Sequence, residues 1–308
     1  MDNLCHTLAG AALGEAGLKR QSALGMGTLL IASNLPDIDV AVFATDTLAM
    51  SFRRGWTHGV LAMAVLPAAL AGLMLLWDRW RAQRANARGL LLLAYLGTWL
   101  HVFMDFLNTY GVRLLMPFSE RWFYGDTLYI VDPVLYVLLG GAVVGARVAA
   151  RRGGSPLRWA RLAVAVAAVY IVVMLGSNVW ARAEVRRGVV RAGRPSDTRF
   201  MVSPVFGNPI RREIIVDTGD RYEKGLLWFE PWPHFRPFGY GVDTNEADPA
   251  ARAASQTPRF KAYLGWARFP FFVIERRADR TRVYLNDYRY SGPSARDGWA
   301  AAAVDVSE

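Results

Sequence analysis

The chain has 308 residues, 53% of them hydrophobic, and a formal net charge of +10. The basic excess is shared along the chain: residues 1–180 contain 15 Lys and Arg against 10 Asp and Glu, and residues 181–308 contain 21 against 16. The charge is therefore not concentrated in one basic domain, and the sequence has no zinc-finger, RRM or helix-turn-helix pattern. We therefore exclude nucleic acid from the expected partners.

Two apolar runs open the chain. The first, Leu4–Leu18, is too short for a membrane span and is rich in small residues. We expect a short helix that packs on its neighbours through Gly10, Ala11 and Gly14. The second run, Ala23–Phe43, is apolar as far as Asn34 and then turns at Pro36, so it predicts an interrupted helix.

Four further stretches approach the ~20 apolar residues that cross a bilayer core. They are Gly59–Trp77, Gly89–Leu107, Ile130–Ala149 and Trp159–Trp180. After residue 180 the chain becomes polar, rich in Arg and interrupted by Pro and Gly. The predicted fold is therefore an α-helical polytopic membrane domain over residues 1–180, followed by a small β-rich soluble domain over residues 181–308.

Lys and Arg residues in the loops predict the orientation. One set of loops carries 11 of them: Lys19, Arg20, Arg79, Arg81, Arg84, Arg88, Arg147, Arg151, Arg152, Arg158 and Arg161. The opposite loops carry Arg53, Arg54, Arg113 and Arg121. By the positive-inside rule the first set is cytoplasmic, which places the N-terminus, residues 34–58, residues 108–129 and everything after Trp180 outside. The four arginines between Arg182 and Arg191 argue the other way, and we follow the larger count.

Short β-like runs fill the second half. They are Arg212–Val216, Gly225–Phe229, Phe271–Glu275 and Thr281–Tyr290, separated by turn signals such as Gly207–Pro209 and Asp217–Asp220. We predict a small antiparallel β domain with a disordered tail after Ser291. Its aromatic residues are expected to pack in the core rather than to cover a site or touch lipid: Trp228, Phe229, Trp232, Phe235, Phe238 and Tyr240. His234 is interpreted as structural.

Ionisable residues gather at one side of the membrane half. They lie within apolar segments or beside them, where a charge is costly and usually functional. In the predicted orientation each falls near the external end of its helix or in an external loop: His6, Asp37, Asp39, His58, His101, Asp105, Asp126 and Asp132. Since the orientation comes from Lys and Arg alone, this convergence supports it independently.

Two motifs place carboxylates beside histidine or beside each other. His101 and Asp105 are four residues apart, so on a helix they share one face and can reach one metal ion. The alternative is a hydrogen-bonded pair that stabilises helix packing. Asp37 and Asp39 follow the break at Pro36, and a spacing of two favours joint coordination; the alternative is a solvated loop with an Asp cap.

Residues 53–58 precede a predicted span. His58 would emerge at the entrance of that helix, with Thr57 as a cap or as a partner of the imidazole. Arg53 and Arg54 suit a phosphate group, and the alternative is that they reach to lipid headgroups. His6 follows Cys5, which we interpret as a buried apolar residue rather than a ligand.

Together these residues predict a metal site. Three of the four histidines lie near the same face with three aspartates, a donor set that suits Zn²⁺ best and also Mn²⁺. Six ligands exceed the need of one closed site, so one or two ions are expected. The predicted ligands are His6, Asp37, Asp39, His58, His101 and Asp105.

Several motifs in this order resemble the bacterial inner-membrane metal-dependent hydrolase family of the LexA-regulated type. They are Met1–Gly10, Asn34–Asp39, Arg54–His58, His101–Asp105, Tyr110–Phe118, Trp122–Asp126 and Ile130–Pro133. The resemblance covers residues 1–150 well and the rest weakly. Cys5 stands where we expect Thr, which leaves the ligand set intact.

This resemblance implies a bacterial inner-membrane hydrolase whose His/Asp set is similar to that of zinc-dependent phospholipase C. A bound metal would activate water, Asp132 or Asp126 would orient a ligand or assist proton transfer, and Arg53 or Arg54 would offset charge on a phosphoryl oxygen. A site at headgroup depth favours a membrane lipid or another amphiphilic phosphoester as substrate. The alternatives are a transporter or channel using the same residues, or a non-catalytic scaffold with a structural metal.

Overall fold

The computed structural model describes residues 1–45, 49–82, 84–278, 280–292 and 302–306. The chain forms two units, which we describe separately. The helical unit comprises Met1–Thr45, Phe52–Ser177 and Phe206–Asn208. The β-rich unit comprises Asp46–Ser51, Asn178–Val205 and Pro209–Glu308.

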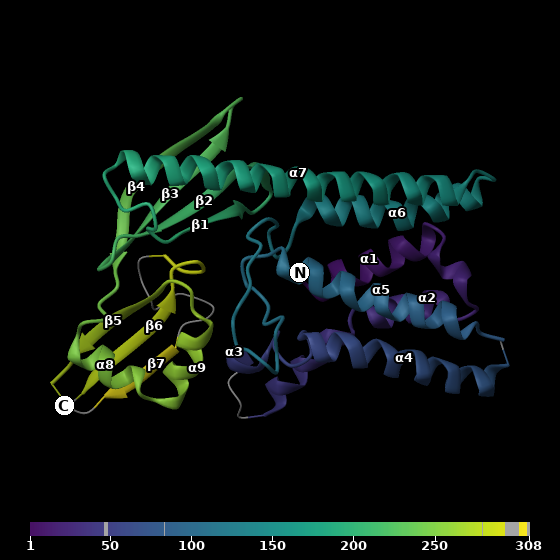
Figure 1. Cartoon of the computed structure of the whole chain (residues 1–308), viewed down its shortest axis with the longest axis horizontal. Helices are drawn as coiled ribbons and strands as arrows, with labels where there is room; N and C mark the ends of the chain where they lie inside the picture. The colour runs from purple at the N-terminus through teal and green to yellow at the C-terminus, as the bar shows by residue number, and fades with distance from the viewer. Residues whose placement is uncertain (46–48, 83, 279, 293–301, 307–308) are drawn as a thin grey trace. The chain divides into compact units, whose positions relative to one another are not determined.

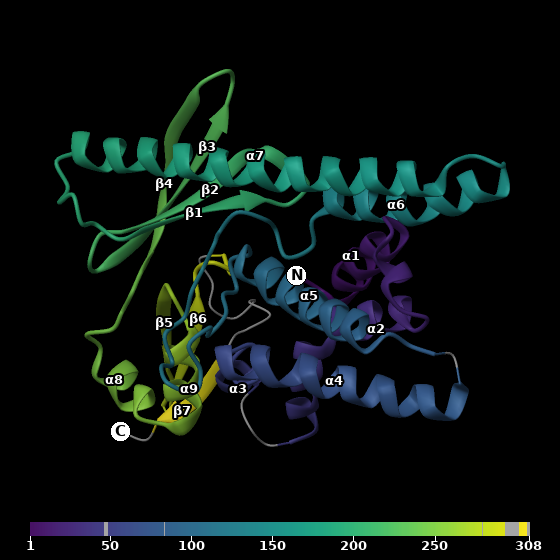
Figure 2. The ribbon, with the colours of Figure 1, turned by 45° about the vertical axis from the view of Figure 1, so that its right-hand side comes forward.

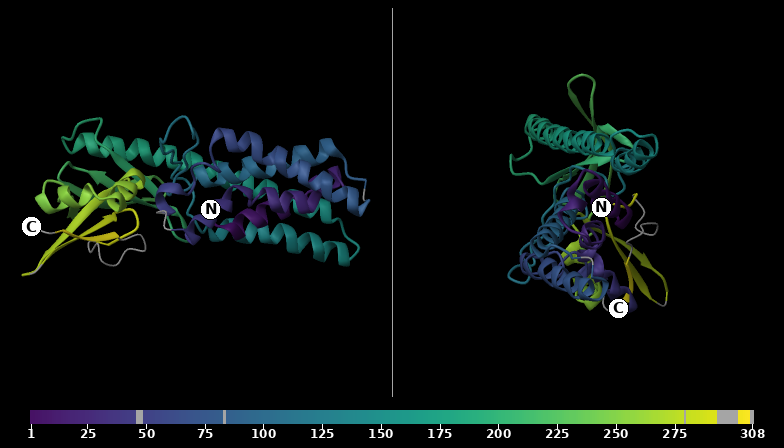
Figure 3. Two further views of the ribbon diagram at one scale, coloured as in Figure 1. Left: turned by 90° about the horizontal axis from the view of Figure 1, so that it is seen from below. Right: turned by 90° about the vertical axis from the view of Figure 1, so that its right-hand side faces the viewer.

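Long helices that run alongside one another dominate the helical unit (Figures 1 and 3). The main helices are α1 (Asn3–Glu15), α2 (Gly25–Ala32), α4 (Val60–Arg81), α5 (Ala87–Phe106), α6 (Pro133–Arg151) and α7 (Pro156–Arg191), of which α7 continues into the β-rich unit. Shorter helices of this unit are η1 (Leu18–Gln21) and η2 (Leu35–Ala44); the short helix α3 (Ala49–Phe52) falls mostly in the segment assigned to the β-rich unit. Helix α5 packs against α2 and α4, and α1 packs against α2 and α6.

Four helices in the described part of the chain, α4, α5, α6 and α7, are long and apolar enough to cross a membrane. A fifth candidate is the pair α2 and η2, which is bent by 49° at a short break. Pro36 lies at the start of η2, where it cannot continue the preceding helix. These elements confirm the four predicted spans and the predicted interruption.

The N-terminal helix α1 packs closely on α2. The Asp2 side chain caps it by accepting hydrogen bonds from the Leu4 and Cys5 N–H groups, at 3.0 and 3.2 Å. A Cβ at Gly10 would lie only 2.9 Å from the Leu29 carbonyl oxygen, so only glycine permits this approach. The predicted packing through small residues is thereby confirmed at Gly10.

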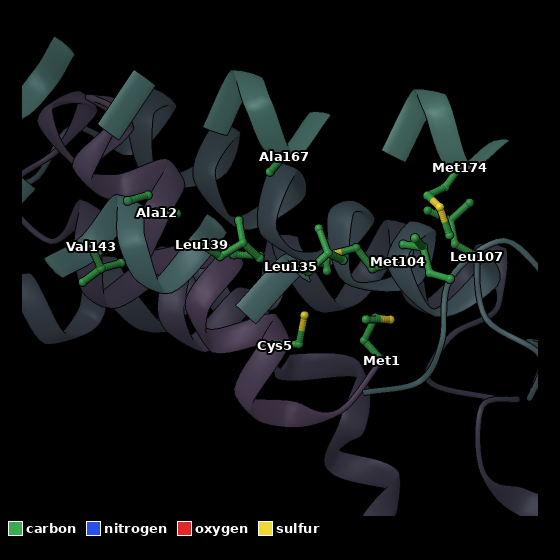
Figure 4. Close-up of a cluster of buried hydrophobic side chains, with 13 residues drawn as sticks. Met1, Cys5, Ala12, Met104, Leu107, Leu135, Leu139, Val143, Ala167 and Met174 are labelled. Atoms are coloured by element: carbon green, nitrogen blue, oxygen red, sulfur yellow. The ribbon is translucent and has the colours of Figure 1, made fainter. Parts of the chain in front are cut away.

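A buried apolar cluster joins α1, α5, α6 and α7 (Figure 4). Its members include Cys5, Met104, Leu135, Leu139 and Met174. Cys5 is fully buried, as predicted for a small apolar residue. Because the same stretches of α1 and α5 carry His6, His101 and Asp105, burial of this cluster fixes the helices that bear the polar residues.

The β-rich unit contains two sheets in its described residues. The first has the order β1-β2-β3-β4, with β1 (Phe200–Val205), β2 (Asn208–Asp217), β3 (Arg221–Phe229) and β4 (Pro233–Asp243). The second has the order β5-β6-β7, with β5 (Pro270–Arg276), β6 (Thr281–Asp287) and β7 (Ala302–Val306). Helices α8 (Pro249–Ser255) and α9 (Pro258–Trp266) lie between them in the chain. The antiparallel pairing of β2–β3, β3–β4 and β5–β6 confirms the predicted class.

Both faces of strand β2 contribute residues to buried clusters. Ile214 and Val216 of β2 join the residues that α7 contributes at a spacing of four, Ala181, Val185 and Val189. Figure 2 shows this part of α7 beside β1–β4. The intervening Ile215 joins a second cluster with Phe269 and Tyr288. Because successive side chains of a strand point to opposite faces of the sheet, β2 contributes residues to two separate buried clusters.

Two predictions for this unit need correction. The expected disordered tail contains strand β7, which pairs with β6; residues 293–301 and 307–308 lie outside the described residues. Phe229 and Phe235 pack against the core, but Trp232 and Tyr240 are 65% and 49% exposed, so core packing is wrong for them. The Phe238 side chain lies outside the described residues. Strands β1 and β4 and both short helices were not predicted; β4 contains two prolines and two glycines, which mask its pattern.

Candidate metal centre

Three segments of the helical unit bring four polar side chains together. Asp37 comes from η2, His58 immediately precedes the Gly59 cap of α4, and His101 and Asp105 lie one turn apart on α5. All four are buried. One ligand atom from each lies within 4.8 Å of all the others, and we call these residues the four-ligand group.

The two imidazoles point their Nε2 atoms at one another. These atoms are 3.3 Å apart. Asp105 Oδ2 lies 3.3 Å from His58 Nε2 and 3.6 Å from His101 Nε2. The Asp37 carboxylate completes the group, with oxygens 3.9 Å from His58 Nε2 and 3.8 Å from His101 Nε2. Two nitrogens and two carboxylates thus surround one small volume.

A backbone contact sets the tautomer of His101. Its Nδ1 lies 2.7 Å from the Ser33 carbonyl oxygen at the end of α2. A carbonyl oxygen only accepts, so Nδ1 carries the proton and Nε2 presents its lone pair to the group. Gly97, one turn earlier, allows this approach because a Cβ there would lie 2.6 Å from the Ala32 Cβ.

His58 is oriented through its other nitrogen in the same way. Its Nδ1 lies 3.0 Å from the Thr57 hydroxyl oxygen and 3.5 Å from Asp39 Oδ2. The hydroxyl is itself 3.2 Å from Asp39 Oδ2, which also accepts the Arg54 backbone N–H at 2.7 Å. Asp39 therefore lies behind His58 and outside the four-ligand group, where it favours a lone pair on Nε2.

The charge distribution of the group fits a bound cation. Two imidazole lone pairs and two carboxylates repel one another when they converge in a buried site. Asp105 Oδ2 is buried and has no hydrogen-bond partner among the described residues. Buried polar atoms rarely lack a partner in proteins, and a bound ion would provide one. Nitrogen and carboxylate oxygen are donors that divalent transition metals accept. The four-ligand group could therefore hold a metal ion.

His6 lies against this group without being one of its four members. Its ring stacks on His101 with centroids 3.7 Å apart, and its Nε2 lies 3.2 Å from Asp105 Oδ1. The amino group of Met1 contacts the same carboxylate oxygen. Of the six predicted ligands, four form the compact group, while His6 and Asp39 flank it.

The two arginines of the predicted motif have different surroundings. Arg54 is buried: it pairs with Asp105 at 3.0 Å and donates to the Asn108 side chain and the Met1 carbonyl, each at 3.1 Å. Its guanidinium also lies over the Tyr110 ring. The Arg53 side chain is 23% exposed and lies 3.2 Å from Asp37 and 3.4 Å from Asp39. Arg53 is thus the cation at the accessible edge.

The other two predicted catalytic residues lie outside the four-ligand group. Asp132 caps α6 by accepting from Val134 and Leu135 N–H, at 3.0 and 3.1 Å, and accepts the Tyr170 hydroxyl at 3.0 Å. These are the contacts of a helix cap. Asp126 is fully buried in the connection between α5 and α6. Their catalytic roles stay predictions.

Sequence reasoning missed several polar partners. The Ser33 carbonyl that orients His101 is a backbone group, for which no residue type gives a signal. Asn108 lies three residues after Asp105, just beyond the end of α5. Its position could have marked it as a partner of Arg54.

Residues 1–181 match the model of the YdjM inner membrane protein family. The chain belongs to this family. The matched part spans more than half of the chain and includes every residue of the four-ligand group. Together with the apolar helices, YdjM family membership shows that this is a membrane protein.

One curated relative was also found. YfhP of Bacillus subtilis (strain 168), itself uncharacterized, is 26% identical to this YdjM family member over 146 residues. The matched region covers 44% of this chain and 43% of YfhP, so it spans less than half the length of that relative. No solved structure matches the chain.

Proposed function

We propose that this protein is a membrane-bound, metal-dependent hydrolase that cleaves a phosphoester in an amphiphilic or lipid-like substrate. The observation that carries the proposal is the buried four-ligand group, in which separate Nδ1 partners leave both imidazole Nε2 lone pairs facing the volume that the two carboxylates also face. Zn²⁺ is the ion that this set of two nitrogens and two carboxylates suits best, and Mn²⁺ would accept the same donors.

Each surrounding residue has a defined task in this proposal. His58, His101, Asp37 and Asp105 hold the ion, with His6 as a further ligand if a second ion binds. A metal of this kind supplies activated water and polarises a phosphoryl oxygen. Asp39 and the Ser33 carbonyl keep the two imidazoles oriented. Arg53, at the accessible edge, offsets negative charge that develops on the phosphoryl group.

The location of the group favours a substrate at the membrane surface. His58 lies at the entrance of α4, and Asp105 lies in the last turn of α5. Both helices are candidate spans, so their ends lie at headgroup depth. Phospholipids present a phosphoester at this depth, which supports a lipid-like substrate over a freely soluble one.

Metal analysis and activity assays test this function directly. The protein purified in mild detergent should retain about one equivalent of zinc, or two if His6 helps to hold a second ion. It should hydrolyse members of a panel of phosphodiesters and phospholipids, lose this activity on chelation and regain it with Zn²⁺. Absence of transition metal would favour a transporter; bound metal without hydrolysis would favour a scaffold with a structural metal.

We also propose that the β-rich unit lies on the periplasmic side of the inner membrane. The 11 Lys and Arg residues counted in one set of loops lie at the ends of the spans opposite to His58 and Asp105. The positive-inside rule assigns that end to the cytoplasm. Alkaline phosphatase fused after Glu308 should therefore be active in cells. A green fluorescent protein fused at the same position should not fluoresce, because it would be exported in an unfolded state. A bright fluorescent fusion with inactive phosphatase would reverse the orientation.

A further inference from the structure

An apolar groove of about 600 Å³ lies between α4 and α5, which run alongside each other (Figure 1). Its lining includes Met63 and Ala64 of α4, Tyr95, Trp99 and Phe103 of α5, and Leu114 from the following loop. The volume falls in the roughly 300–1,000 Å³ range of small-molecule sites. The groove belongs wholly to the helical unit.

Two hydrogen bonds from α5 to the backbone of α4 brace this groove, and a proline explains the first of them. Pro67 lies inside α4 and has no N–H, so it cannot donate to the Met63 carbonyl four residues earlier. The Trp99 indole N–H donates to that carbonyl at 3.2 Å instead, and the Tyr95 hydroxyl donates to the Ala64 carbonyl at 2.6 Å. In a membrane such backbone oxygens need an internal donor.

These two bonds shape the groove as well as satisfying the backbone. They tie α5 to α4 through the polar atoms of Tyr95 and Trp99, which are thereby used on the helix backbone. The groove is therefore lined by the aromatic rings of these residues and by the aliphatic side chains of their neighbours. The lining therefore suits hydrocarbon, and it is held in place before any ligand arrives.

The groove and the four-ligand group draw on neighbouring residues of α4 and α5. Val60, which contributes to the lining, is two residues after His58. Phe103 and Phe106 contribute from α5 on either side of Asp105. The lining begins at Val60 and Phe106, at the same helix ends as the metal ligands, and extends about three turns along α5 to Tyr95. Because α4 and α5 are candidate spans, the groove therefore leads from headgroup depth towards the lipid chains.

We propose that the groove binds an acyl chain of the substrate while the phosphoester of the same molecule reaches the four-ligand group. The substrate class is then an acylated phosphoester, a phospholipid in its simplest form. This inference rests on the proposed hydrolase function and adds the recognition element for its substrate. An acyl chain matches the apolar lining of the groove, and in a phospholipid it is attached to the phosphoester that the four-ligand group would bind.

Filling the groove tests this proposal. Ala64→Trp should lower kcat/KM for a long-chain phospholipid at least tenfold and leave zinc content and hydrolysis of bis(p-nitrophenyl) phosphate unchanged. Ala64→Leu, a milder change, should give a smaller loss in the same direction. Val65→Trp is the matched control, because Val65 is the next residue on α4, is 55% exposed and does not line the groove.

A second measurement separates the groove from the hydrolase activity. Native mass spectrometry should find phospholipid retained by the original protein and by Val65→Trp, and less by Ala64→Trp. Normal long-chain hydrolysis by a metal-replete Ala64→Trp would overturn the acyl-chain site. If no form hydrolyses any substrate, the proposed function fails, and lipid retention alone decides: equal retention by Ala64→Trp and Val65→Trp would overturn the groove as a lipid site.

Discussion

Replacing His101 by alanine should remove the bound metal ion and reduce hydrolysis to background. His101 supplies one of the two nitrogen ligands of the four-ligand group. Without it, one nitrogen and two carboxylates remain to hold the ion. Loss of a residue that merely orients a ligand weakens metal binding by about 10–100-fold, and loss of the ligand itself should exceed that. Zinc content by mass spectrometry and phosphodiester hydrolysis should fall together.

His234 provides the matched control for this change. It lies in the β-rich unit, is exposed and contacts the Glu230 carbonyl at 3.3 Å and the Trp228 ring. His234→Ala should therefore keep full zinc content and activity. A His101→Ala protein that is metal-replete and fully active would refute the metal centre. Loss of activity with zinc retained would place His101 in substrate handling instead.

Replacing Asp287 by alanine should destabilise the β-rich unit by about 3–5 kcal/mol, the usual cost of leaving a buried charge without its partner. Asp287 is fully buried and accepts bonds from Arg289 Nη2 and Nε at 2.8 and 3.0 Å and from the Arg268 N–H at 2.6 Å. Its removal leaves the buried guanidinium of Arg289 without this acceptor. Protease cleavage of the full-length protein within this unit should therefore begin at lower temperature.

The same pair predicts the direction of the pH dependence. Burial alone would raise the pKa of the Asp287 carboxyl, but the Arg289 charge and the hydrogen bonds hold that pKa below its usual value. A lowered carboxyl pKa contributes stability that is complete above the unfolded pKa of about 3.9 and is lost as pH falls through the folded pKa. The difference between the original protein and Asp287→Ala should therefore shrink only in acid.

An exposed ion pair is the control for Asp287. Arg221 and Asp243 lie 2.8 Å apart with side chains 44% and 64% exposed. Asp243→Ala should change stability by no more than about 1 kcal/mol, since solvent screens such pairs. Equal cleavage of Asp287→Ala and Asp243→Ala proteins would show that burial of the Asp287–Arg289 pair contributes little.

Sequence reasoning predicted the spans well because an apolar run of span length rarely occurs outside a membrane helix. It also predicted which polar residues would meet, since three histidines near one membrane face point to a shared site. It could not distinguish Asp37 from Asp39. The two residues lie in the 3-10 helix η2, and a spacing of two does not show which carboxylate faces the histidines. Arg53 and Arg54 posed the same difficulty, and only tertiary packing shows that one is buried and the other half-exposed.

In the β-rich unit the misses have a different cause. Strand β7 is Ala302–Val306, whose alanines have low strand propensity and gain order from pairing with β6. Strand β4 carries its prolines and glycines in a position that pairing with β3 tolerates. Pairing with a neighbouring strand decided both elements, and the residue types of β4 and β7 do not by themselves predict a strand.

All four ligand residues lie within the first 105 residues, and none comes from α6 or α7. A ribosome that synthesises the chain from its N-terminus therefore delivers the complete donor set before the last two spans emerge. Mutual repulsion of the donors disfavours the arrangement of η2, α4 and α5 that brings them together, although Arg53, Arg54 and the Met1 amino group offset part of it. Ion capture during insertion would remove that repulsion and leave α1 and α5 ready for α6 to dock. Under the proposed function, metal supply at the time of synthesis would then affect how readily the later helices pack.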